Sequence, residues 1–209
     1  MFPYDYIIES TNESLANLGV EQIYLQQLHT WTDAWTEREE WRRAAEQLKR
    51  SGKIRFFGIS VAEHDPDSAL EAVRTGLIDS VQVIYNIFDQ TPERNLFPLC
   101  QERKVGVLAR VPLDEGGLTG TIREDTQFPP GDFRESYFRG DRKRQVVERV
   151  EALKKDLDLA GVPGTLPEIA IRFCLSHPAV TTVIPGMRRV ASVESSCRAA
   201  ARENWMSAH

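Results

Sequence analysis

The chain has 209 residues, a hydrophobic content of 41% and a formal net charge of −5 at pH 7. This length and composition predict one folded domain with a sizeable core, and the acidic balance argues against a nucleic-acid partner. The sequence offers no apolar stretch long enough for a membrane span and no signal-peptide pattern, so we expect neither. The three scattered cysteines, Cys100, Cys174 and Cys197, lack metal-ligand spacing and predict reduced thiols in a cytoplasmic protein without a metal site.

Short apolar runs alternate with helix-like stretches along the whole chain. The apolar runs predict strands over residues 22–28, 54–59, 80–85, 105–109 and 181–184. Helical periodicity and capping residues predict helices over residues 5–18, 37–51, 65–75, 92–103, 141–157, 166–176 and 190–203. Strands alternating with helices are typical of an α/β fold in which helices wrap a parallel sheet.

Two segments depart from this rhythm. Residues 33–37 form a polar loop flanked by Trp31 and containing Trp35. Residues 111–140 are rich in glycine and proline, and loops of this length are usually functional lids or disordered segments. The basic run Arg139–Arg144 contains Asp141 and is typical of a solvated helix start.

The carboxyl ends of the predicted strands carry a set of polar or small residues. In parallel sheets wrapped by helices, the chemistry lies at these ends. The residues found there are His29, Ser60, Asn86, Arg110 and Gly186. We therefore expect the candidate active site at this edge of the sheet.

Several segments, in this order, resemble the aldo/keto reductase family. They are Ser14–Gly19, Tyr24–His29, Gly52–Ser60, Val81–Asn86, Pro112–Gly120 and Val183–Arg188. The resemblance implies a (β/α)8 TIM-barrel fold that binds NADPH or NADH and reduces carbonyls to alcohols. It covers the family domain from its third barrel helix onward, so residues 1–209 are expected to form an incomplete barrel that lacks the first three βα units.

The resemblance assigns a catalytic position to His29. The family's Asp, Tyr and Lys of the acid–base set have no counterpart here, and we found no convincing replacement among the other tyrosines. His29 then either donates a hydrogen bond to a substrate carbonyl or is a half-buried histidine satisfied by backbone or water.

The same resemblance implies a nicotinamide half of a cofactor site. Ser60 and Gln82 match the residues that bind the nicotinamide carboxamide. Arg110 stands where many members place a stacking aromatic residue, and its planar guanidinium is suited to stacking or to pairing with the pyrophosphate. A surface arginine at a strand end is the alternative.

The remaining cofactor residues implied by the resemblance lie further along the chain. Those matching the loop over the pyrophosphate are Leu113, Gly117 and Leu118, with a plain turn as the alternative. Those matching the adenosine-phosphate segment are Gly186, Arg188, Ser192 and Ser196. Arg188 matches a basic residue near the adenosine 2′-phosphate, which favours NADP over NAD.

Two functions follow as hypotheses. The first is NAD(P)H-dependent reduction of a small carbonyl substrate by hydride transfer, impaired here because the Asp, Tyr and Lys are absent. The second is a non-catalytic fragment or a nucleotide-binding or interaction module. In either case the open edges of an incomplete sheet predict self-association.

Overall fold

The computed structural model describes residues 2–62 and 64–201, and this part of the chain contains five strands and eight α-helices. The strands are β1 (Ile23–Trp31), β2 (Ile54–Val61), β3 (Ser80–Ile84), β4 (Gly106–Arg110) and β5 (Val180–Ile184). The helices are α1 (Tyr4–Leu18), α2 (Glu39–Arg50), α3 (Leu70–Arg74), α4 (Leu96–Arg103), α5 (Phe133–Tyr137), α6 (Arg142–Leu159), α7 (Leu166–Ser176) and α8 (Val190–Ala201). The end of the helix predicted over 190–203 lies outside the described residues.

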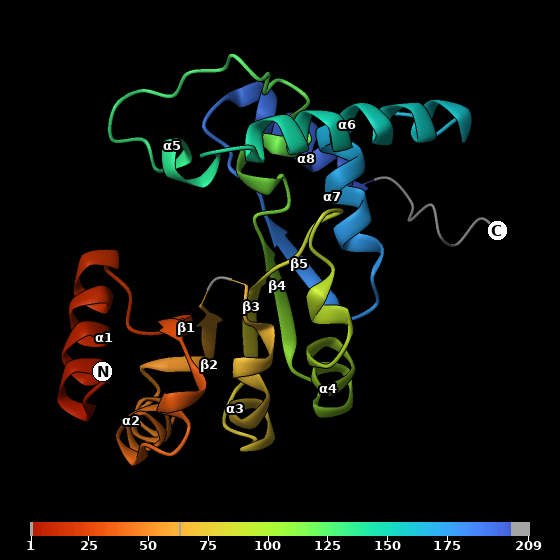
Figure 1. The fold of residues 1–209 in the computed structure, drawn as a ribbon. Helices are drawn as coiled ribbons and strands as arrows, with labels where there is room; N and C mark the ends of the chain where they lie inside the picture. The colour runs from red at the N-terminus through yellow and green to blue at the C-terminus, as the bar shows by residue number, and fades with distance from the viewer. Residues whose placement is uncertain (1, 63, 202–209) are drawn as a thin grey trace. The chain divides into compact units, whose positions relative to one another are not determined.

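The strands form one sheet in chain order, β1-β2-β3-β4-β5, and the pairs β1–β2, β2–β3 and β3–β4 are parallel. Figure 1 shows the strands separated along the chain by helices. Each of the five predicted strands is confirmed, with bounds that shift by a few residues. The α/β class and the parallel sheet predicted from the alternation of runs are therefore confirmed.

One face of the sheet is a buried apolar surface. The register aligns four side chains across β1 to β4, each at most 5% exposed. They are Leu28, Ile59, Val81 and Val107. Helix α2 packs against β2 on this face, where the ring of Trp41 lies parallel to that of Phe57 at 6.3 Å. This burial is the main hydrophobic contribution to the sheet.

The strand β1 continues further than its apolar run predicted. Trp31 belongs to the strand and not to the loop that follows, and its side chain is fully buried. The indole Nε1 donates to the carbonyl of Ser68 at 3.2 Å, and the ring meets Trp41 edge to face at 5.2 Å. Trp31 is therefore a packing anchor of the core.

The described chain divides into two compact units. Of the described residues, the first contains 2–62, 64–85, 90–110 and 178–182, and the second contains 86–89, 111–177 and 183–201. The second unit has its own small core, made by Phe138, Val146 and Val150. The segment predicted as a loop, 111–140, holds a short 3-10 turn at Asp114–Thr119 and helix α5, so it is more structured than its composition indicated.

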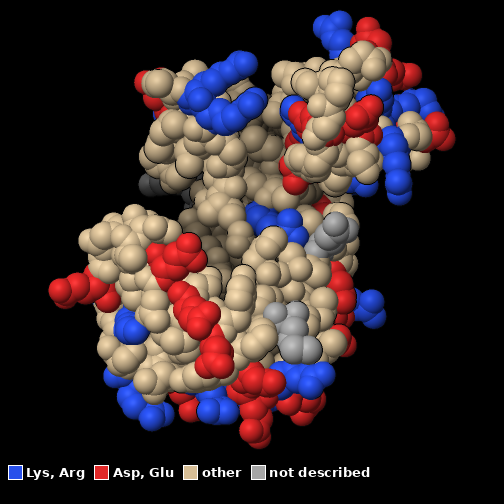
Figure 2. All heavy atoms as spheres, turned by 90° about the vertical axis from the view of Figure 1, so that its left-hand side faces the viewer, with Lys and Arg blue, Asp and Glu red and all other residues tan. Residues whose placement is uncertain are grey.

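The outer surface of helix α1 is acidic. Asp5, Glu9 and Glu13 are exposed and follow one another at four-residue spacing, and the last turn of the helix contains no basic residue. Figure 2 shows acidic side chains in a line across the lower part of the face that includes this helix. Carboxylates at this spacing repel each other, and such a surface repels polyanions.

Replacing Trp31 with Phe is expected to lower the free energy of unfolding by about 2 kcal/mol. The smaller ring leaves space in the core, and the carbonyl of Ser68 loses its indole donor. Urea unfolding followed by the fluorescence of the remaining tryptophans measures the change. Trp35→Phe is the matched control, because Trp35 is partly exposed, and it should cost less than ~0.5 kcal/mol. Equal effects of the two changes would contradict the anchoring role of Trp31.

Candidate functional site

Three of the predicted site residues form one row across the sheet. The register pairs His29 of β1 with Ser60 of β2, and Ser60 with Gln82 of β3. Paired residues of neighbouring strands lie about 4.8 Å apart and point to the same face. His29 is exposed, Gln82 is partly exposed, and Ser60 is buried. The row thus places an imidazole, a hydroxyl and a carboxamide side by side, near the carboxyl ends of β1 and β2 and in the middle of β3.

Arg110 ends β4 on the same face as this row. Its register partner is Ile84, two residues beyond Gln82, and its Nη2 donates to the carbonyl of Val61 at 3.3 Å. The guanidinium is half-buried, so it is not a plain surface arginine. This bond orients the guanidinium of Arg110 toward the end of β2.

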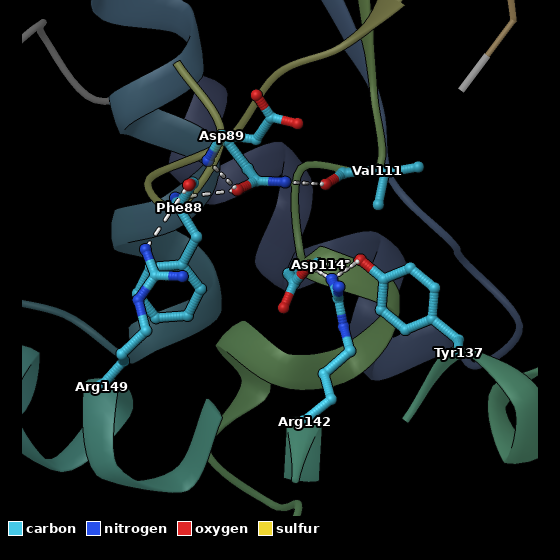
Figure 3. Close-up of polar contacts among 8 residues, drawn as sticks. Phe88, Asp89, Val111, Asp114, Tyr137, Arg142 and Arg149 are labelled. Carbon is cyan, nitrogen blue, oxygen red and sulfur yellow. Dashed lines mark hydrogen bonds and ion pairs between the residues drawn. The ribbon is translucent and has the colours of Figure 1, made fainter. Parts of the chain in front are cut away.

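Asn86, which follows β3, has a structural role. Its side chain is buried, its Nδ2 donates to the carbonyl of Val111 at 3.0 Å, and its Oδ1 accepts from the backbone N–H groups of Phe88 and Asp89. Figure 3 shows these bonds. The strand-end position predicted an active-site candidate, but the side chain closes a turn of the second unit with its amide donor and its oxygen both engaged.

The loop predicted to cover a pyrophosphate is tightly packed against its own unit. A Cβ at Gly117 would lie 2.6 Å from Oδ2 of Asp114 and 3.0 Å from Cγ1 of Val146. Leu118 is fully buried, whereas Leu113 is partly exposed. Internal packing alone therefore explains why a glycine stands at position 117, and the choice between a plain turn and a phosphate loop stays open.

A buried carboxylate cluster holds this loop. The Tyr137 hydroxyl donates to Oδ1 of Asp114 at 2.6 Å, and Nη2 of Arg142 donates to the Tyr137 oxygen at 2.6 Å. The Arg142 guanidinium also lies over the Tyr137 ring, 4.0 Å from its centroid, and 3.5 Å from Oδ1 of Asp114. Figure 3 shows the three side chains converging from the 3-10 turn, helix α5 and helix α6.

The cluster explains why Tyr137 is a poor proton donor. Burial, followed by the hydrogen bond to Asp114, raises the pKa of Tyr137 well above its ordinary value of 10.0. The phenolic proton is thereby committed to the carboxylate. The sequence did not reveal Asp114 or Arg142, because nothing in the chain indicates that a loop aspartate and the solvated-looking run Arg139–Arg144 contact each other. The run Arg139–Arg144 leads into helix α6 as predicted, and Arg142, whose side chain is 40% exposed, also contacts the cluster.

The segment predicted to hold an adenosine phosphate surrounds the start of α8. Gly186 and Arg188 are exposed, and the backbone N–H groups of Ser192 and Val193 both donate to the carbonyl of Arg189. Ser192 and Ser196 are partly buried on the helix itself. This segment lies in the second unit, whereas the row on the sheet and Arg110 lie in the first.

The described residues offer neither a metal site nor a reactive buried thiol. Within residues 2–62 and 64–201, no three His, Cys, Asp or Glu side chains are grouped so that they would hold a metal ion. Burial raises the pKa of both the Cys100 and the Cys174 thiols to about 12, so both stay protonated near neutral pH.

Within residues 2–62 and 64–201, no helix has the length and apolar character that a membrane crossing requires.

The sequence profile of the Aldo/keto reductase family matches residues 3–204. The chain therefore belongs to the aldo/keto reductase family. Its fold agrees with this, since it resembles the glycerol dehydrogenase AKR11B4 of Gluconobacter oxydans with a TM-score of 0.77 and 26% identity over 93% of this chain. It also resembles the holo form of the aldo-keto reductase AKR11C1 of Bacillus halodurans, with a TM-score of 0.75 and 28% identity over 99% of this chain.

Curated relatives agree with the family. The chain is 30% identical to the uncharacterized oxidoreductase YqkF of Bacillus subtilis over 93% of its own length and 60% of the relative. It is 28% identical to the aldo-keto reductase yakc [NADP(+)] of Schizosaccharomyces pombe over 92% of its own length and 56% of the relative. It is 30% identical to the NADH-specific methylglyoxal reductase of Escherichia coli over 86% of its own length and 55% of the relative. The chain thus spans between half and two thirds of the length of these relatives.

Replacing Tyr137 with Phe is expected to lower the free energy of unfolding at neutral pH by about 1–2 kcal/mol, because Asp114 loses a hydrogen-bond donor. The raised pKa means that the folded state favours the protonated phenol. Its stabilisation is complete below pH 10.0, the ordinary pKa of the group, and is lost as the pH rises above it. Urea unfolding of both proteins at neutral and alkaline pH should therefore show a difference that narrows above pH 10.0.

The matched control for this change is Tyr6→Phe. Tyr6 is 59% exposed on helix α1, so the loss of its hydroxyl should alter stability by less than ~0.5 kcal/mol at any pH. A Tyr137→Phe difference that stays constant with pH would contradict the raised pKa. The absence of any difference would contradict the cluster.

Proposed function

We propose that this chain supplies the cofactor-binding and carbonyl-orienting side of an NAD(P)H-dependent oxidoreductase site. The observation that carries the proposal is the row His29–Ser60–Gln82, whose members are register partners on three neighbouring parallel strands. The family to which the chain belongs and the names of two relatives, which carry NADP(+) and NADH, support a nicotinamide cofactor.

The residues of the row fit the groups they would bind. Ser60 has a hydroxyl that donates and accepts, and Gln82 has an amide that does the same, so both complement a carboxamide. His29 is exposed beside them and is able to donate a hydrogen bond to a carbonyl oxygen. Arg110, whose register partner Ile84 lies two residues beyond Gln82, provides a planar cation. This cation is suited to stacking or to binding a phosphate.

The chemistry proposed for this site is the reduction of a small carbonyl compound to an alcohol. The bound cofactor would supply the hydride that forms the new C–H bond. The alkoxide that results needs a proton, and we propose that this step is impaired in the present chain. The sequence contains no counterpart of the family's Asp, Tyr and Lys, and the proton of Tyr137 is committed to Asp114. A non-catalytic fragment, or a nucleotide-binding or interaction module, is therefore the second candidate function.

Other residues are proposed for the remaining parts of the cofactor. We propose that Leu113, Gly117 and Leu118 form the wall beside the pyrophosphate. We propose that Gly186, Arg188, Ser192 and Ser196 receive the adenosine phosphate. Arg188 is exposed and therefore available to a 2′-phosphate, which supports NADP over NAD.

The remaining assignments are proposals of the same kind. Residues 1–209 would form the part of an aldo/keto reductase domain from its third barrel helix onward, acting on a small carbonyl substrate in the cytoplasm. The free thiols support the cytoplasmic assignment, since Cys100, Cys174 and Cys197 form no disulfide. Self-association through the sheet edges is proposed in addition.

Titration with NADPH tests the cofactor site. We expect saturable quenching of the four tryptophans, and Arg188→Ala should raise the dissociation constant for NADPH about 10-fold, with little change for NADH. Arg189→Ala is the matched control, because it removes a neighbouring exposed charge, and it should change the constant less than ~2-fold. Equal effects of the two variants would show that only general electrostatic attraction is lost. The absence of saturable binding by the unaltered chain would overturn the proposal.

Turnover of NADPH with small aldehydes separates the two candidate functions. Binding without measurable oxidation of the cofactor would favour the nucleotide-binding module. Turnover that His29→Ala lowers, with the NADPH dissociation constant unchanged, would favour the reductase.

Sedimentation velocity tests self-association. The strands β1 and β5 stand at the two ends of the strand order, so we expect the sedimentation coefficient to rise with protein concentration. Tyr24→Lys places a charge on β1 at a side chain that is 63% exposed and should weaken the association. Tyr6→Lys, at 59% exposure on helix α1, is the control and should not. A compact monomer at every concentration would contradict the prediction.

A further inference from the structure

Glu168 is a carboxylate that is buried at the start of helix α7. It is 7% exposed and stands three residues after Thr165, the residue that precedes the helix. Its Oε2 accepts from the backbone N–H of Thr165 at 3.1 Å, and the Thr165 side chain accepts in return from the backbone of Glu168, which completes a capping box. One oxygen of the carboxylate thus closes the N-terminus of α7.

The second oxygen of Glu168 faces a different helix. Its Oε1 accepts from the hydroxyl of Ser195 at 3.2 Å and lies 3.6 Å from Nε of Arg198. Both partners belong to α8. A single carboxylate therefore joins two helices that are packed against each other in the second unit.

Apart from its packing against α7, the described part of helix α8 buries little side-chain surface. Of its described residues only Ala199 is buried, whereas Val190 and Val193 are 75% and 39% exposed. Most of the stability of a protein helix comes from packing an apolar face, and α8 packs very little of one. The polar contacts with Glu168 are therefore important for holding helix α8 in its position.

The carboxylate is ionised at neutral pH. The backbone hydrogen bond from Thr165 is the largest cause that lowers the pKa of Glu168, with Ser195 and Arg198 acting in the same direction. Hydrogen bonds to an ionised acceptor are about twice as strong as those between neutral groups. The attachment of α8 is thus made of charge-assisted contacts that are present under physiological conditions.

We infer that Glu168 is the positioning residue of the adenosine end of the cofactor site, because its side chain fixes helix α8 through Ser195 and Arg198. Ser192 and Ser195 are three residues apart and share one side of the helix, and Ser196 follows directly. The bond from Ser195 to Glu168 therefore positions Ser192 and Ser196 on the helix. It also positions the segment that leads from Gly186 into α8. This inference rests on the proposed function for the cofactor part, whereas the attachment of α8 is a property of the fold.

Ser195→Ala is the most selective test, because it removes the Ser195 contact of the attachment and leaves the cap of α7 intact. In the full chain, hydrogen exchange of the amides of α8 should become about 10-fold faster, and exchange in α7 should change less than ~2-fold. The dissociation constant for NADPH should rise about 3- to 10-fold. Glu168→Ala should accelerate exchange in both helices. Glu168→Gln keeps the cap and a bond to Ser195. It should therefore return the exchange rate of α7 to that of the unaltered chain and the exchange rate of α8 part of the way.

Two matched controls accompany these variants. Ser14→Ala removes a partly buried helix hydroxyl that donates to the carbonyl of Ser10 in its own helix. Glu151→Gln removes an exposed carboxylate of α6 that pairs with Lys154. Neither control should alter exchange in α8 or the dissociation constant for NADPH.

The outcomes separate this inference from the proposed function. Unchanged exchange in α8 of both Ser195→Ala and Glu168→Ala would overturn the attachment. Faster exchange in α8 with unchanged NADPH affinity would overturn the positioning role. If the unaltered chain binds no NADPH, the cofactor site and the positioning role fail together, and the exchange data still decide whether Glu168 holds α8.

Discussion

The register of the parallel sheet is the constraint on which the candidate site depends. Side chains alternate between the two faces of a strand, so burying Leu28, Ile59 and Val81 on one face directs the neighbouring residues to the other. A slip of one residue in any strand would bring a polar side chain into the core and an apolar one out of it. The hydrophobic energy of the buried face thus aligns the imidazole, hydroxyl and carboxamide of the polar row.

Two buried carboxylates link elements of the second unit. Asp114 joins the 3-10 turn to α5 and α6 through Tyr137 and Arg142, and Glu168 joins α7 to α8. A buried carboxylate is costly unless it is paired and hydrogen-bonded, so each one demands a particular arrangement of its partners. These contacts give a glycine-rich loop and a weakly packed helix a defined geometry.

Binding and proton transfer make different demands on the chain. The proposed binding of a cofactor uses a hydroxyl, an amide and cations. Proton donation near neutral pH needs an acid whose pKa is tuned toward the working pH, and the structure tunes Tyr137 in the opposite direction. The proposal of a cofactor-binding protein with impaired chemistry follows from this contrast.

The sequence by itself determined the class of fold, the order of the five strands along the chain and the resemblance to the aldo/keto reductase family, because local periodicity and motif spacing are written in neighbouring residues. It did not determine that Trp31 is a core residue, that Asn86 closes a turn, or that Arg142 is half-buried beside Tyr137. Those facts depend on which distant residues come into contact. Only tertiary packing decides this, since the free energy of a buried polar group is set by its partners and not by its own position in the chain.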